Sequence, residues 1–212
     1  IMKIVKIIKK NKIWILLLLL LFLCIVLGFV YYNTKNIENF TADEYNHVHK
    51  ILMDNLEKTI KVFNKHNIQY WATAGTLLGS IRDKKIIEHD DDIDLGLFKE
   101  DFLKIQNNKN NIIKDFNDIG LHIIISSPEL YHNKIVTKKN DNNYKKNKIF
   151  IDIESFEQYG NKFKVNQELY KEDFWKNEFF YKNELLPLKN SKLSNLTIKI
   201  PNDPIKYLER RY

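Results

Sequence analysis

The sequence contains few cysteine, proline and glycine residues, and each shortage excludes a class of protein. Its 212 residues include one Cys, four Pro and six Gly. A single cysteine excludes a disulfide scaffold and any zinc site built from cysteines. The low proline and glycine content excludes collagen-like and linker sequence, and a hydrophobic content of 44% excludes a disordered chain. The length then allows one compact domain with a tail.

Acidic residues are absent from the first 32 positions, which contain five lysines. The formal net charge of +7 therefore comes largely from the N-terminus, because the remaining residues include 29 bases and 27 acids. Binding to nucleic acid requires basic residues clustered on the folded part of a protein. The charge distribution thus argues against a nucleic-acid partner.

Residues 13–32 form a long uncharged run, IWILLLLLLFLCIVLGFVYY. About twenty apolar residues in a helix span a hydrocarbon core of roughly 30 Å. Trp14 at one end and Tyr31 and Tyr32 at the other suit the two membrane interfaces. A cleaved signal peptide is the alternative, but its apolar region is shorter and ends in a small-residue cleavage site. The run predicts a transmembrane signal anchor.

The lysines before this run set its expected orientation. The positive-inside rule places the N-terminus in the cytoplasm and the rest of the chain outside it. This predicts a single-pass type II membrane protein whose folded domain is lumenal or extracytoplasmic, as in the Golgi or endoplasmic reticulum. Sequons at Asn39 and Asn195 are consistent with a glycoprotein in that compartment. The expected organisation is a basic cytoplasmic flank at 1–12, the anchor at 13–32, a stem at 33–42 and a folded domain at 43–212.

Hydrophobic periodicity predicts that helices and strands alternate in the domain. The expected fold class is α/β (α+β), with a small mixed β-sheet flanked by helices. Between the last two strands, the Asn- and Lys-rich stretch 133–148 is interpreted as a surface loop or a loosely formed hairpin. Helices are expected at 43–67, 76–84, 100–118 and 203–212, and strands at 68–73, 93–98, 121–126 and 149–156.

An acidic cluster provides the first functional signal. Aspartates at positions 90, 91, 92 and 94 lead directly into an apolar strand. Residues two apart in a strand project from the same face, so Asp92 and Asp94 point together. Two carboxylates held this close repel each other unless a cation lies between them. Hard oxygen ligands of this kind favour Mg²⁺ or Mn²⁺.

A third carboxylate of the same kind occurs later in the chain. Asp152 lies in the apolar strand FIDIESF, with Glu154 two residues further on the same face. If this strand pairs beside the first, Asp152 joins Asp92 and Asp94. Such a set suits a two-metal clamp, with ions about 3.5–4 Å apart, that promotes in-line displacement at phosphorus. Glu154 is a secondary candidate.

The segment before the acidic cluster has the features of a phosphate site. Gly75 and Gly79 are expected to bracket a tight strand-to-helix turn, where glycine lets backbone N–H groups approach a phosphate. Thr76 adds a hydroxyl group, and a helix N-terminus favours anions. Arg82 offers a planar fork for phosphate oxygens. These four residues are the candidate substrate-binding residues.

Residues 75–97, GTLLGSIRDKKIIEHDDDIDLGL, resemble the signature of the LicD/fukutin-type family in the polymerase-β-like nucleotidyltransferase superfamily. The expected strand at 69–73 and the segment IDIESF at 151–156 also resemble that family. The terminal run 208–212, LERRY, is similar to the start of a late family motif that usually continues with glycine. The likeness covers residues 45–156, and it implies a nucleotidyltransferase fold.

The resemblance implies a metal-dependent transferase that moves a phospho-alcohol, such as phosphocholine or ribitol phosphate, from a CDP-linked donor to a glycan hydroxyl, releasing CMP. The implied partners are a CDP-alcohol donor, a glycan or glycoconjugate acceptor and the membrane, with Mg²⁺ or Mn²⁺ as cofactor. Carried over residue by residue, Asp92 and Asp94 are metal ligands, Asp152 is the third carboxylate and proton acceptor, Gly75 and Thr76 contact the donor phosphates, and Arg82 steadies the transferred group.

Other interpretations stay open at this point. The acidic cluster could belong to a calcium-binding or capping loop, although EF-hand spacing is absent. Arg82 could form an ordinary surface ion pair. The same metal triad would serve a nucleotidyltransferase that uses a nucleoside triphosphate. A third possibility is a catalytically inactive, membrane-anchored glycan-binding protein on the same scaffold.

Overall fold

The computed structural model describes residues 21–28, 41–125, 132–137, 149–165 and 176–212. The chain divides into two units, Ile1–Thr41 and Ala42–Tyr212. In the first unit, 21–28 is helical and its side chains are exposed. The rest of the expected anchor at 13–32 lies outside the described residues, as do the flank at 1–12 and most of the stem. No helix among the described residues is both long and apolar enough to cross a bilayer.

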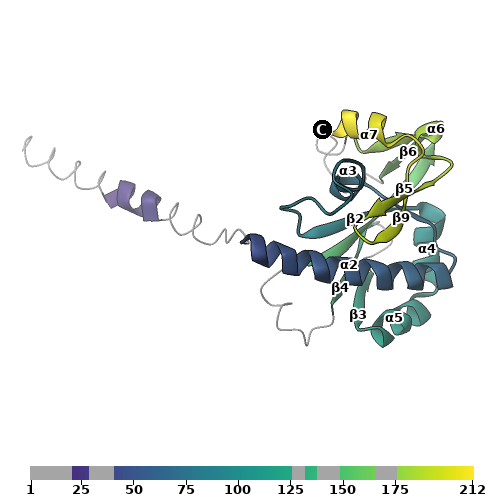
Figure 1. Ribbon diagram of the computed structural model, residues 1–212, viewed down its shortest axis with the longest axis horizontal. Coiled ribbons are helices and arrows are strands. Elements are labelled where there is room, and N and C mark those ends of the chain that lie inside the picture. Colours follow the sequence, from purple (N-terminus) through teal and green to yellow (C-terminus); the bar gives the residue numbers. More distant parts are fainter. Residues whose placement is uncertain (1–20, 29–40, 126–131, 138–148, 166–175) are drawn as a thin grey trace, which may run out of the picture. The chain divides into compact units, whose positions relative to one another are not determined.

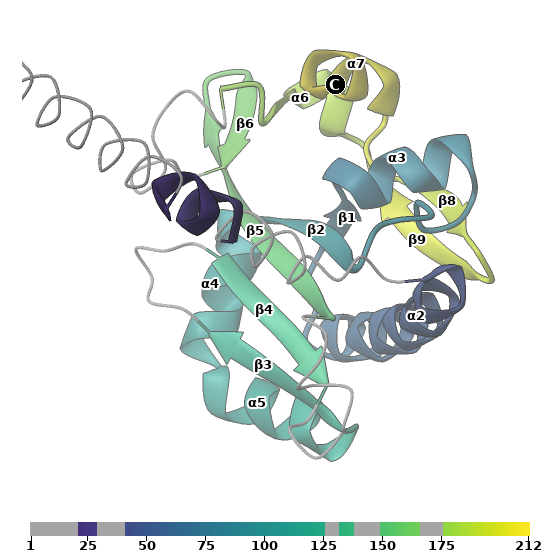
Figure 2. The ribbon, with the colours of Figure 1, turned by 90° about the vertical axis from the view of Figure 1, so that its left-hand side faces the viewer.

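The second unit is built on a mixed β-sheet of seven strands (Figures 1 and 2). Five strands follow one another in the order β1-β2-β5-β4-β3, and β6 and β7 extend the sheet from the far end of β5. The pairing of β2 with β5 is parallel, and the other pairings are antiparallel. The strands are β1 Tyr70–Ala72, β2 Asp92–Phe98, β3 Leu121–Ile125, β4 His132–Thr137, β5 Phe150–Tyr159, β6 Lys162–Val165 and β7 Phe179–Tyr181.

Three helices cover one face of this sheet: α2 Ala42–Lys65, α4 Lys99–Asn107 and α5 Lys109–Asp118 (Figure 2). The alternation along β2 and β5 explains the arrangement, because Ile93, Leu95 and Ile151 are fully buried while the residues between them are acidic. The hydrophobic face of the sheet therefore packs against the helices, and the acidic side chains project from the opposite face.

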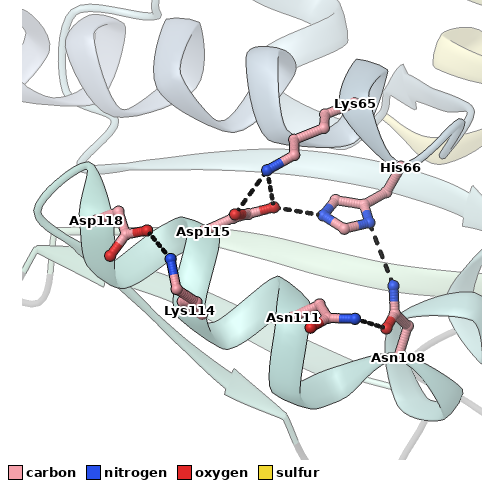
Figure 3. A network of polar contacts seen from close by, with 7 residues as sticks. All are labelled: Lys65, His66, Asn108, Asn111, Lys114, Asp115 and Asp118. Carbon is pink, nitrogen blue, oxygen red and sulfur yellow. Dashed lines mark hydrogen bonds and ion pairs between the residues drawn. The ribbon is translucent and has the colours of Figure 1, made fainter.

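A polar network joins the end of α2 to α5 (Figure 3). The Asp115 carboxylate accepts hydrogen bonds of 2.8 Å from Lys65 Nζ and 2.7 Å from His66 Nε2. The other ring nitrogen of His66 lies 3.4 Å from the amide nitrogen of Asn108. Lys65 and His66 hold the pKa of Asp115 below its usual value. The network connects the C-terminal end of α2 to α5.

The remaining elements form a second layer beside the strand β1. They are α3 Ala74–Arg82, α6 Lys182–Leu185, the hairpin of β8 Lys189–Leu193 and β9 Leu196–Ile200, and α7 Pro204–Arg211. The helix α3 contacts β2, β8 and α7, and β9 contacts β1. This layer places α3 beside β2, the strand that carries Asp92 and Asp94.

The structure confirms the mixed sheet with flanking helices and most of the expected elements, but the single helix predicted at 100–118 is wrong. It divides into α4 and α5 at Asn108, whose φ of −113° and ψ of 28° are not helical. An asparagine side chain competes with the backbone for hydrogen bonds, which weakens a helix interior. At this position it contacts His66 instead, so a tertiary contact accompanies the break.

Residues 133–148 were expected to form a surface loop or a loosely formed hairpin, and the loop alternative is wrong for the first residues, because β4 pairs antiparallel with β3 and β5 inside the sheet. The strand is hard to recognise since only Ile135 and Val136 supply buried apolar side chains, while Asn133 is a buried polar residue. Residues 138–148 lie outside the described part of the chain.

Candidate functional site

The parallel register of β2 and β5 brings the predicted carboxylates together. Asp94 pairs with Asp152, and Asp92 lies two residues earlier on the same face of β2. One carboxylate oxygen from each of the three lies within 4.8 Å of the others. All three side chains are half-buried. The convergence expected from the two strand patterns is therefore present in the fold.

The first turn of α3 holds Asp94 in place. The Gly75 N–H donates to Asp94 Oδ2 over 3.1 Å, and the Thr76 N–H points to the same oxygen over 3.4 Å. The Asp94 N–H donates to the Thr76 hydroxyl oxygen over 2.8 Å. Thus Gly75 and Thr76, predicted to contact donor phosphates, fix the carboxylate of a candidate metal ligand.

Position 75 has little room for a side chain. A Cβ atom added there would lie 2.7 Å from Asp90 Oδ2 and 3.4 Å from Asp94 Oδ2. The preceding residue, Ala74, has a φ of +43°, in the left-handed region that non-glycine residues rarely adopt. The turn is therefore held in a tight conformation so that backbone N–H groups reach the carboxylates.

Burial and mutual repulsion raise the pKa of several carboxyl groups on this face. Desolvation, followed by the charges of Asp152 and its acidic neighbours, raises the pKa of Asp92 to about 6. Desolvation and Asp92 raise the pKa of Asp94 well above its usual value. Desolvation raises the pKa of Glu154 to about 7, although Arg211 acts in the opposite direction. These groups lack sufficient positive charge, which a divalent cation would supply.

Lys134 of β4 supplies one positive charge to this face. It pairs with Asp152 in the register, and its Nζ lies 2.9 Å from Asp152 Oδ1. The same ammonium group lies 3.6 Å from the centre of the Phe150 ring. Lys134 also acts to lower the pKa of Asp92.

The C-terminal helix α7 fixes the start of α3. The Tyr207 hydroxyl group is 2.9 Å from the Thr73 hydroxyl and accepts a hydrogen bond of 3.3 Å from the Ala74 N–H. Tyr207 also donates to the buried Glu178, which forms an ion pair with Arg211. The Tyr207 ring stacks on Phe180 with centroids 4.0 Å apart. These contacts tie the end of the chain to the turn that positions Asp94.

Two predicted substrate-binding residues do not join this set. Gly79 lies inside α3 and does not bracket the turn; a Cβ there would be 2.4 Å from the Lys85 carbonyl oxygen, so the glycine serves close packing of the backbone. Arg82 ends α3, is exposed, and pairs with the adjacent Asp83 through its Nη2 at 2.6 Å. Gly79 thus serves the packing of α3, and Arg82 forms a local ion pair.

Sequence patterns missed three residues of the site. Lys134 falls in the stretch interpreted as a surface loop or a loosely formed hairpin, and Tyr207 and Arg211 fall in the helix expected at 203–212. The signal that could have found Lys134 is the alternation in NKIV, which places its side chain opposite that of Ile135. Arg211 also belongs to the run LERRY that resembles a late family motif, but neither that run nor the helix pattern indicates where the helix packs.

Comparison with known proteins gives a family for this arrangement. The model of the LicD/FKTN/FKRP nucleotidyltransferase domain matches residues 67–203, which include Asp92, Asp94 and Asp152. An uncharacterized protein of Rickettsia typhi is 36% identical over 157 residues, covering 74% of this chain and 44% of that protein. One from Rickettsia prowazekii is 33% identical, covering 74% and 52%. The chain spans about half the length of these two relatives.

Human ribitol-5-phosphate transferase FKTN is 38% identical over 66 residues, or 31% of this chain and 13% of that protein. The solved structure of ANT(2″)-Ia in complex with adenylyl-2″-tobramycin aligns with 74% of this chain and 83% of its own, at 10% identity and a TM-score of 0.42. The family model covers well over half of the sequence and contains the acidic face. The chain belongs to the family of LicD/FKTN/FKRP nucleotidyltransferase domains.

Proposed function

We propose that this chain carries the catalytic domain of a metal-dependent phosphotransferase. It moves a phospho-alcohol from a CDP-linked donor to a hydroxyl group of a glycan and releases CMP. The observation that carries this proposal is the convergence of Asp92, Asp94 and Asp152 from two neighbouring parallel strands, with one oxygen of each within 4.8 Å of the others.

Family membership supports the reaction class. The relative FKTN is named a ribitol-5-phosphate transferase, and its 66 matched residues are 38% identical. Ribitol phosphate is a phospho-alcohol, which agrees with the donor class that the sequence signature implies. Phosphocholine and glycerol phosphate are related groups that the same chemistry would transfer.

The donor set of the acidic face fits Mg²⁺ or Mn²⁺. Three half-buried carboxylates are the oxygen ligands that these ions prefer, and burial together with repulsion among the acidic groups raises the pKa of Asp92 and Asp94. Asp92, Asp94 and Asp152 would hold the ion. When bound, it would neutralise charge on the donor's phosphates and on the leaving group.

The chain's own residues would position the reactants. The hydrogen bonds from Gly75 and Thr76 keep Asp94 from turning away from the face. The acceptor hydroxyl oxygen forms a bond to the phosphorus distal to cytidine, and the bond from that phosphorus to the CMP oxygen breaks. Asp152 takes the proton that the hydroxyl group loses. Most of the rate enhancement then comes from positioning and electrostatic stabilisation.

The setting of the reaction is part of the same proposal. The uncharged run at 13–32 anchors the protein in a membrane as a single-pass type II protein, and the catalytic domain faces the lumenal or extracytoplasmic side. Glycan acceptors are abundant in that compartment. Asn195, one of the two sequon asparagines, lies in the exposed turn between β8 and β9, where glycosylation is sterically possible.

A ligand screen on the full chain in detergent tests the donor class. CDP-choline, CDP-ribitol, CDP-glycerol and nucleoside triphosphates are compared for magnesium-dependent protection against thermal unfolding, followed by assay of CMP release. We expect protection by a CDP-alcohol and, with a glycan acceptor present, CMP release that is lost in Asp92→Asn and Asp94→Asn. Selective protection by triphosphates would favour the nucleotidyltransferase reading. CDP-alcohol binding without turnover on any glycan would favour a binding protein.

A further inference from the structure

The ammonium group of Lys134 occupies a specific place on the acidic face. Its Nζ lies 2.9 Å from Asp152 Oδ1, and the Phe150 ring holds it from one side at 3.6 Å. The Lys134 side chain is 36% exposed and the Asp152 side chain 19%. Lys134 therefore contacts a predicted metal ligand while about a third of its side chain stays exposed to solvent.

Two other cations near the site form their ion pairs with residues outside the triad. Arg211 pairs with the buried Glu178, and Arg82 pairs with Asp83 at the exposed end of α3. Within the described ranges, Lys134 is the cation that forms an ion pair with a member of the triad.

A divalent cation and the Lys134 ammonium group compete for Asp152. An ion bound by Asp92, Asp94 and Asp152 would place two positive charges within a few ångströms of Nζ, and like charges at this range repel. The Lys134 stem is flexible, and lysine binds phosphate as a compact point charge. A donor whose phosphates bind this ion would bring them close to the Lys134 ammonium group.

We propose that Lys134 balances the triad until a divalent cation binds, and that its ammonium group then contacts a phosphate oxygen of the donor. The first half concerns the metal alone. The second half rests on the proposed function, because it requires a ligand with a diphosphate. Lys134 is thus a further substrate-binding residue, and its ion pair with Asp152 sets the metal affinity of the free protein.

The first half is tested by titrating Mn²⁺ into the full chain without nucleotide, with bound metal read by electron paramagnetic resonance. In Lys134→Met, which keeps the length of the side chain and removes its charge, we expect Mn²⁺ to bind about three- to tenfold more tightly. Lys134→Arg should resemble the parent chain. Unchanged or weaker binding in Lys134→Met would overturn the competition between ammonium and metal.

The second half is tested at saturating Mn²⁺ with inorganic pyrophosphate, CDP and cytidine as probes. Loss of a charge-assisted hydrogen bond of about 1.5–3 kcal/mol corresponds to roughly 10- to 100-fold weaker binding. We expect this loss for pyrophosphate and CDP in Lys134→Met, and no change for cytidine. Equal pyrophosphate affinity in the variant and the parent would refute the phosphate contact.

A matched ion pair, whose carboxylate lies on β5 as that of Asp152 does, supplies the control. Lys99 Nζ lies 2.6 Å from Glu157 Oε1 on β5, with side-chain exposures of 28% and 27%. Lys99→Met should leave both the Mn²⁺ and the pyrophosphate affinities unchanged. The pyrophosphate comparison also separates the two proposals, because a parent chain that binds pyrophosphate but no CDP-alcohol contradicts the proposed donor and leaves the role of Lys134 intact.

Discussion

At the scale of single residues, the acidic face is unfavourable in the metal-free protein. Burial and mutual repulsion raise the pKa of Asp92, Asp94 and Glu154, so the folded state resists their ionisation. Carboxyl groups with raised pKa values are typical of functional sites, where they are placed to bind a ligand although they lower the stability of the fold. The same carboxylates that bind a cation should therefore destabilise the protein in its absence.

Replacing one of these carboxylates should stabilise the metal-free protein. We expect Asp92→Asn to raise the free energy of unfolding at pH 7 by about 1–2 kcal/mol, a discounted value because Asp92 is partly exposed. The same variant should lose stabilisation by Mg²⁺. Denaturant titration with and without Mg²⁺ measures both effects. Glu88→Gln, an exposed substitution in the loop that precedes β2, is the control, and a destabilised Asp92→Asn would contradict the electrostatic account.

At the scale of elements, the short helix α7 connects three parts of the site. Its Tyr207 hydroxyl group meets Thr73, Ala74 and Glu178 just before the turn that fixes Asp94. Because these polar atoms are buried, removing the hydroxyl group takes the Ala74 N–H from its acceptor and leaves Thr73 and Glu178 with one hydrogen bond fewer. The position of Asp94 thus depends on a helix more than a hundred residues later in the chain.

Removal of the Tyr207 hydroxyl group should weaken both stability and metal binding. We expect Tyr207→Phe to lower the free energy of unfolding by about 1–3 kcal/mol, the usual effect of leaving a buried polar group unsatisfied. Mn²⁺ affinity should also fall because the first turn of α3 is less fixed. Tyr212→Phe is the matched control at the exposed end of the chain. Equal Mn²⁺ affinity in Tyr207→Phe would show that α7 does not position the triad.

The contact between α2 and α5 offers a second prediction at this scale. Asp115→Asn removes the carboxylate that Lys65 and His66 share, so we expect a lower unfolding temperature at pH 7 (Figure 3). The difference from the parent should shrink in acid, because a carboxyl group whose pKa is lowered by folding stabilises only while ionised. Asp118→Asn, whose partner Lys114 lies on the same helix, should have the smaller effect. A difference that grows in acid would contradict this reading.

Sequence patterns predict what is local and repetitive, and they fail where distant contacts decide. The alternation in one strongly apolar strand places Asp92 and Asp94 on one face, whereas Asp152 joins them only if the two strands pair, as β2 and β5 do in the structure. Nothing in the helical periodicity of 100–118 reveals that Asn108 meets His66 and breaks the helix there. Lys134 was missed because its strand has only two buried apolar residues, so its place between β3 and β5 depends on pairing.

At the scale of the whole molecule, two groups of carboxylates act in opposite directions as the pH changes. On the acidic face the folded-state pKa is raised, so protonation between about pH 7 and pH 4 favours the folded state. Away from this face, Asp115, Asp83 and Glu157 have lowered pKa values because of their basic partners. Their stabilisation is lost as the pH falls through those lowered values.

The metal-free protein should consequently be most stable in mild acid, at about pH 4–6, and lose stability on both sides of that range. Divalent cations bind the ionised carboxylates, so saturating Mg²⁺ should stabilise the protein most at neutral pH and shift the maximum upward. Thermal unfolding across this pH range, with Mg²⁺ or with a chelator, measures both curves. In Asp92→Asn the metal-free maximum should broaden toward neutral pH. A metal-free curve that rises steadily up to pH 7 would mean that the acidic face is already neutralised by the protein's own cations, and a metal centre there would lose its electrostatic basis.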